Sequence, residues 1–87
     1  MKSFTTRRFR EAYGSLPDEV RLQARRAFHL FKQNASHPGL NFKKVDGENN
    51  IYSVRIGLGY RALGRADGEA IVWFWIGTHA DYDKMLS

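Results

Sequence analysis

The sequence has no cysteine among its 87 residues, so it can form neither a disulfide nor a thiolate metal site. Acidic residues are also scarce, because nine Asp and Glu stand against fourteen Lys and Arg and give a formal net charge of +5. On so small a chain, this imbalance predicts a positive potential over much of one surface. We therefore expect an anionic partner, either a nucleic acid or an acidic protein, although ordinary solubilising charge accounts for the same imbalance.

Long apolar runs are absent as well. No stretch approaches the roughly 20 apolar residues that span a bilayer, and the N-terminal residues lack the apolar core of a signal peptide. The composition, with 43% hydrophobic and 26% charged residues, is that of a globular protein. These features predict a soluble cytoplasmic protein without a membrane partner, folded as one domain over residues 1–87 with a small core.

Three apolar-rich runs in the C-terminal half predict an antiparallel meander. Residues Tyr52–Ile56 and Tyr60–Arg65 alternate in polarity, as half-buried strands do, and a glycine-bearing break separates them. The pair Asp67-Gly68 then predicts a tight hairpin turn, since both residue types tolerate a positive φ. The seven consecutive apolar residues Ala70–Ile76 follow, and we expect them to form the most buried strand.

Two helices are predicted before the meander. Thr5 or Thr6 can cap a first helix that ends near Tyr13, and the helical spacing of apolar residues predicts a second helix over Pro17–Asn34. After a loop, Asn41–Val45 can add a short strand to the sheet. The expected fold is therefore α+β, with an N-terminal helix pair packed on one face of a small antiparallel sheet of three to four strands.

The other face of this sheet is expected to be open and basic. Alternation along the strands brings two arginines side by side on it, and the residues that follow the last strand reach its end. The expected members are the arginines Arg55, Arg61 and Arg65, one or both of Lys43 and Lys44, and two residues beyond the last strand, His79 and Tyr82.

Arginine and histidine together suit the cleavage of an RNA backbone. A guanidinium donates a planar pair of hydrogen bonds that matches phosphate oxygens, and an imidazole can move a proton near neutral pH. A base would remove the proton of the ribose 2′-hydroxyl, cations would stabilise the crowded phosphate, and an acid would protonate the departing oxygen. The carboxylates fall mostly at caps and turns, without the spacing of a two-metal nuclease, so neither a metal nor a cofactor is expected. A binding surface or plain solvated charge fits the same residues.

Four short strings carry a resemblance to a known family. They are YSVRI at residues 52–56, GYRAL at residues 59–63, IGTH at residues 76–79 and DYDK at residues 81–84. Together with the order of helices and strands, they resemble the RelE/ParE superfamily of bacterial type II toxins. Compared with that family, the strand before the first helix is shortened or missing here, and Ser53 replaces a lysine of its best-known ribosome-dependent branch.

The resemblance implies two alternative activities. Its RelE branch implies a ribosome-dependent mRNA interferase, an endoribonuclease that represses translation and is held inactive by an antitoxin whose segment covers the active face. Its ParE branch implies an inhibitor of DNA gyrase that cuts no RNA, and a shared fold does not decide between the two. A non-catalytic module that binds nucleic acid or an antitoxin is a third expectation.

Site roles follow from the resemblance position by position. Arg61 matches the arginine that contacts the scissile phosphate, and Arg55 matches a basic position that also serves phosphate. His79 and Tyr82 fall near the family's C-terminal acid and base positions, so either residue can be the acid or the base. Further RNA contacts are expected from three cations, Lys43, Lys44 and Arg65.

Overall fold

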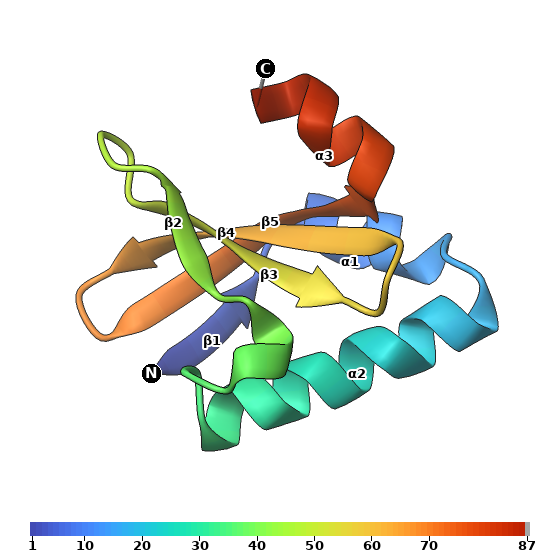
Figure 1. The fold of residues 1–87 in the computed structure, drawn as a ribbon, viewed down its shortest axis with the longest axis horizontal. Helices are drawn as coiled ribbons and strands as arrows, with labels where there is room; N and C mark the ends of the chain where they lie inside the picture. The colour runs from blue at the N-terminus through green and yellow to red at the C-terminus, as the bar shows by residue number, and fades with distance from the viewer. Residues whose placement is uncertain (87) are drawn as a thin grey trace.

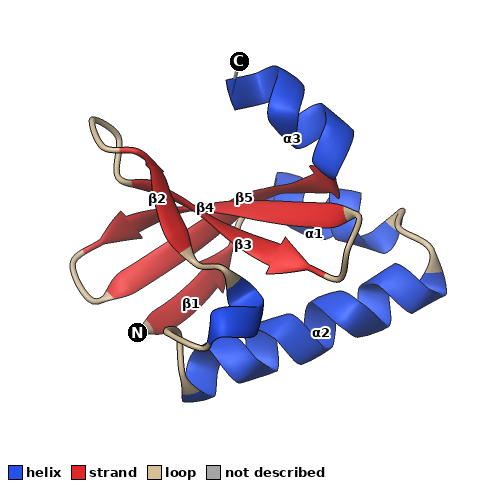
Figure 2. Cartoon of the chain, viewed as in Figure 1, coloured by secondary structure: helices blue, strands red, loops and turns tan. Residues whose placement is uncertain are grey.

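The computed structural model describes residues 1–86, which form a five-stranded sheet with helices on both of its faces (Figure 1). The elements in chain order are β1 (Lys2–Thr5), α1 (Arg7–Gly14), α2 (Asp18–Gln33), the 3-10 turn η1 (Pro38–Leu40), β2 (Lys43–Asp46), β3 (Ile51–Ile56), β4 (Tyr60–Asp67), β5 (Ala70–Thr78) and α3 (His79–Leu86). The strand order is β1-β5-β4-β3-β2, and only the β1–β5 pairing is parallel. The predicted α+β fold and antiparallel meander are confirmed (Figure 2).

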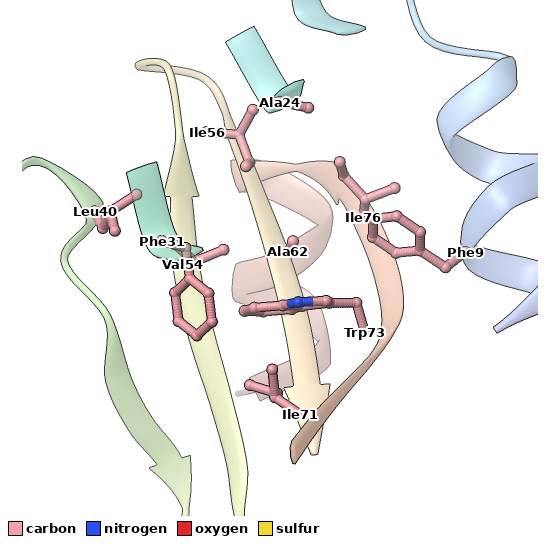
Figure 3. Close-up of a cluster of buried hydrophobic side chains, with 10 residues drawn as sticks. All are labelled: Phe9, Ala24, Phe31, Leu40, Val54, Ile56, Ala62, Ile71, Trp73 and Ile76. Atoms are coloured by element: carbon pink, nitrogen blue, oxygen red, sulfur yellow. The ribbon is translucent and has the colours of Figure 1, made fainter. Parts of the chain in front are cut away.

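The hydrophobic core lies between the sheet and the helix pair α1 and α2. Trp73 of β5 is only 1% exposed, and the rings of Phe28 and Phe31 meet it edge-on at centroid distances of 5.0 and 5.4 Å. Each such aromatic pair stabilises the fold by about 0.5–1.5 kcal/mol beyond its buried area. The buried cluster, drawn in Figure 3, comprises Phe9, Ala24, Phe31, Leu40, Val54, Ile56, Ala62, Ile71, Trp73 and Ile76.

The two predicted helices are confirmed, and local sequence explains where each begins. The Thr6 hydroxyl accepts a hydrogen bond from the Phe9 N–H at 3.1 Å, so a threonine caps α1 as expected. Helix α2 begins directly after Pro17, with Asp18 and Glu19 in its first turn, where carboxylates interact favourably with the helix dipole. Among residues 1–86, no helix is long and apolar enough to cross a membrane.

The strand before the first helix, expected to be shortened or missing, is present as the four-residue β1, and with it the sheet has five strands, more than the expected three to four. Strand β1 pairs with β5, and the N–H groups of Lys2 and Thr6 donate to the carbonyls of Glu69 and Trp73 at 2.9 and 3.0 Å. These bonds have a physical reason, because β5 is the most apolar strand and would otherwise leave its backbone unpaired at the sheet edge.

The open face is also smaller than expected, because a third helix covers part of it. Figure 1 shows α3 above the sheet on the side opposite α2. Strand β5 is less completely buried than predicted, since Phe74 and Trp75 are each only partly buried. A register irregularity also lies between Leu63 and Gly64, where Phe74 is the unpaired extra residue of β5.

Candidate functional site

Two arginines lie directly opposite each other on the sheet face that carries α3. Arg55 of β3 pairs with Arg61 of β4, and on the other side of Arg61 lies Gly77 of β5. Directly opposed residues of antiparallel strands point to the same face with their Cβ atoms about 4.5–5.5 Å apart. Like charges at that separation destabilise a sheet, so an anion bound between the two guanidinium groups would be stabilising.

Both guanidinium groups are held by the backbone. The Arg55 Nε donates to the carbonyl of Gly57 at 3.1 Å, and the Arg61 Nη1 donates to the carbonyl of Tyr60 at 3.0 Å. Each guanidinium has five N–H donors, so these bonds fix the side chains while leaving donors for an anion. The sequence-predicted arginine pair is therefore brought together and oriented.

Tyr82 docks α3 onto this face. Its side chain is 6% exposed, and its hydroxyl donates to the Ser53 Oγ at 3.2 Å, with Ser53 itself only 1% exposed. The Arg61 Cζ lies 6.0 Å from the centroid of the Tyr82 ring, within reach of a cation–π contact. Tyr82 thus presents its ring to Arg61, while its hydroxyl makes a buried hydrogen bond with Ser53.

His79 lies at the start of α3, next to the turn that joins β3 and β4. Its backbone N–H donates to the carbonyl of Gly59 at 2.8 Å, its ring centroid is 5.9 Å from that of Tyr82, and its side chain is about half exposed. The Nε2 atom lies 3.4 Å from the Asp83 Oδ1. The imidazole is therefore accessible and has a carboxylate that can orient it, as a proton-transferring histidine requires.

The three remaining predicted cations, Lys43, Lys44 and Arg65, do not all lie near the arginine pair. Lys43 pairs with Ser53 and faces the same side as the arginine pair, whereas the Nζ of Lys44 lies 5.6 Å from the ring of Tyr52 on the opposite face. Arg65 shares the face of Arg61 but lies four residues further along β4, which is about 13 Å at the usual rise of a strand. Of the two lysines, the structure thus brings only Lys43 to the arginine face.

Sequence reasoning missed the contribution of Ser53 and of the turn between β3 and β4. Alternation places Ser53 on the same face as Arg55, but nothing in the sequence predicts a role for its hydroxyl. Its partnership with Tyr82 joins residues 29 apart in sequence, which no local pattern signals.

A second basic surface lies on the face of the sheet that α1 and α2 cover. A groove of about 730 Å³ opens between β1, α1 and α2, with buried aromatic residues in its floor. The described side chains along it include four arginines or lysines and no carboxylate. They are Ser3, Thr5, Phe9, Arg10, Tyr13, Arg25, Arg26, Phe28, His29, Lys32 and Trp73.

Comparison with known proteins places the chain in a family. Residues 18–84 match the family model of the ParE-like toxin domain, which is most of the chain. The chain belongs to the ParE-like toxin family. The predicted membership of the RelE/ParE superfamily is thereby confirmed.

Solved structures share the fold of this ParE-like chain at low sequence identity. A chain of the RelB–RelE antitoxin–toxin complex from Methanococcus jannaschii is 18% identical, with a TM-score of 0.75 over 97% of this chain and 99% of that chain. The YoeB/ParE toxin from Agrobacterium tumefaciens is 15% identical, with a TM-score of 0.69 over 91% and 99%. A chain of the intact Escherichia coli RelBE complex is 16% identical, with a TM-score of 0.67 over 87% and 93%. No curated protein sequence matches the chain.

Proposed function

We propose that this chain is the toxin of a bacterial toxin–antitoxin system and a ribosome-dependent mRNA endonuclease that represses translation in the cytoplasm. The observation that carries the proposal is the opposed pair Arg55 and Arg61, fixed by backbone hydrogen bonds beside an accessible His79. Two oriented guanidinium groups suit one phosphate, and a neighbouring imidazole suits proton transfer.

The reaction is an attack of the ribose 2′-oxygen on the adjacent phosphorus. The new bond closes a 2′,3′-cyclic phosphate while the bond from phosphorus to the 5′-oxygen breaks. Arg61 and Arg55 would stabilise the extra negative charge on the phosphate oxygens, and His79 would accept the 2′-hydroxyl proton or protonate the departing 5′-oxygen. Within residues 1–86, no group of three or more His, Asp and Glu residues is placed to hold a metal.

Tyr82 supports the site through its ring. Its hydroxyl would have to leave the buried bond with Ser53 before it could act as an acid or a base. In the proposed mechanism the ring instead lies beside the Arg61 guanidinium and limits where that group can point.

An antitoxin is the proposed protein partner. Two of the fold relatives come from complexes of a toxin with an antitoxin, which supports such a partner here. The groove beside α1 and α2 supports a partner of acidic and apolar character, because its floor is aromatic and its rim carries Arg10, Arg25, Arg26 and Lys32.

Inhibition of DNA gyrase is the second candidate, favoured by the ParE-like description of the matching family. It predicts DNA breaks and loss of supercoiling while translation at first continues. In that case the arginine pair would contact protein or DNA without cutting RNA. A supercoiling assay without inhibition would count against it.

The deciding experiment is primer extension on a cellular mRNA after brief induced expression. Wild type should create new 5′ ends at defined codon positions, and Arg61→Ala should abolish them while its circular dichroism spectrum stays unchanged. Arg8→Ala is a matched control, because Arg8 is an exposed arginine of α1, away from the α3 face. Intact mRNA in cells whose growth is arrested would overturn the endonuclease and favour gyrase.

A further inference from the structure

Leu58 is the most exposed large apolar side chain in the described part of the protein. It is 82% exposed at the tip of the turn that joins β3 to β4, between Gly57 and Gly59. Single exposed leucines are common on protein surfaces and usually need no explanation. This one is distinguished by how rigidly its turn is held and by which residues hold it.

Three other elements fix the turn. The Gly57 carbonyl accepts from the Arg55 Nε at 3.1 Å, and the Gly59 carbonyl accepts from the His79 N–H at 2.8 Å. Gly57 has φ +57°, and a Cβ there would lie 2.5 Å from the Gln23 Oε1 of α2, so the turn packs closely on that helix. The backbone on both sides of Leu58 is thus anchored, and its side chain projects from a fixed position.

The same two hydrogen bonds place the turn of Leu58 beside Arg55 and His79. The residue before it binds the Arg55 guanidinium, and the residue after it binds the backbone of His79. An RNA whose phosphate sits on the arginine pair would therefore bring the bases next to that phosphate close to an exposed leucine.

RNA cleavage by the 2′-oxygen needs a rearranged backbone. The attacking oxygen must approach phosphorus opposite the departing 5′-oxygen, and two stacked nucleotides of a regular strand do not offer that alignment. Proteins that bind the DNA minor groove unstack neighbouring bases by inserting an apolar side chain, leucine among them, between them. A leucine fixed beside the phosphate-binding arginines has the position and the chemistry for this task.

We propose that Leu58 is a wedge that enters between the two bases flanking the scissile phosphate and holds them unstacked for in-line attack. The inference rests on the proposed endonuclease function and adds a residue that selects the substrate conformation. The wedge contacts a base, the arginines contact the phosphate, and His79 moves the proton.

The test uses ribosomes programmed with an mRNA that carries 2-aminopurine at the cleaved position, because its fluorescence rises when the base is unstacked. Wild type should raise the fluorescence and cleave the RNA. Leu58→Ala should lose the fluorescence rise and cleave at least about tenfold more slowly. Leu58→Met, which keeps apolar bulk, should retain most of both, and Leu22→Ala, at an exposed leucine of α2, should match wild type.

The outcomes separate the wedge from the function on which it rests. Cleavage by Leu58→Ala at the wild-type rate with the same fluorescence rise would overturn the wedge and leave the endonuclease standing. A fluorescence rise without cleavage by wild type, lost in Leu58→Ala, would support the wedge and overturn the endonuclease. Relief of growth arrest in Leu58→Ala with unchanged RNA cleavage and fluorescence would mean that the leucine contacts a protein, and the wedge would be wrong.

Discussion

The hydrogen bond between Tyr82 and Ser53 should be the main polar contact that holds α3 on the sheet. Both side chains are buried, at 6% and 1% exposure, and Tyr82 is the only buried residue among those described in α3. Tyr82→Phe leaves the Ser53 hydroxyl without this partner, and Ser53→Ala does the same to the Tyr82 hydroxyl. Leaving a buried polar group unsatisfied costs about 1–3 kcal/mol, so each variant should lose about that much stability.

The double variant Tyr82→Phe with Ser53→Ala tests whether the loss of stability comes from an unsatisfied buried hydroxyl or from two independent losses of packing contacts. Removing both hydroxyls leaves no buried group unsatisfied, so the double variant should be no less stable than the worse of the two single variants. The assay is urea unfolding of all four proteins, supported by melting temperatures, which shift by about 4–8 °C per kcal/mol for a domain of this size. Single effects that add in the double variant to within about 0.5 kcal/mol would refute the coupling.

Two further predictions concern the sheet and its turn. Gly64→Ala should destabilise the fold by about 1–3 kcal/mol in urea unfolding, because a Cβ would lie 2.7 Å from the Trp73 Cε3 and 2.9 Å from the Ile71 Cγ1. Gly59→Ala, where a Cβ would meet nothing within 4 Å, is its control, and equal effects would contradict the packing argument. The Asn49 side-chain amide, helped by the backbone N–H groups of Asn49 and Glu48, lowers the pKa of Asp46 below its usual 3.8. This stabilisation is present above pH 3.8 and is lost as the pH falls through the lower folded value, so Asn49→Ala should flatten the acid limb of stability measured against pH. An unchanged acid limb would disprove this role.

The sequence predicted those elements whose signal is local. The alternation within residues 52–56 and within residues 60–65 places Arg55 and Arg61 on one face, and the apolar spacing of α2 predicts that helix. Strand β1 was missed because its four residues are too few for a period, and the strand that explains them begins 65 residues after β1 ends, at Ala70. Helix α3 was missed because it buries only Tyr82, so its apolar residues form no stripe.

The sequence predicts which residues of the candidate site share a face of the sheet, but it does not predict which of them are neighbours. Alternation shows which side of a strand a residue occupies, but only the pairing with a neighbour shows which residues meet. Lys43 and Lys44 illustrate this, because the register of β2 against β3 determines that Lys43 pairs with Ser53 and Lys44 pairs with Tyr52. The irregularity between Lys44 and Asp46 alters that register further along the strand and has no signature in the sequence.

The docking of Tyr82 also bears on why such a site would need the ribosome. Cleavage requires both a base and an acid, yet among the described residues of the candidate site only His79 presents an accessible imidazole that can transfer a proton, since the Tyr82 hydroxyl is bound to Ser53. The second proton transfer must then come from water, from the RNA or from the surface that holds it. An enzyme that supplies the phosphate site and one proton-transferring group depends on its surroundings for alignment and for the other group. On the proposed function, the protein alone should therefore cleave free RNA poorly, and a surface that fixes the mRNA should raise the rate.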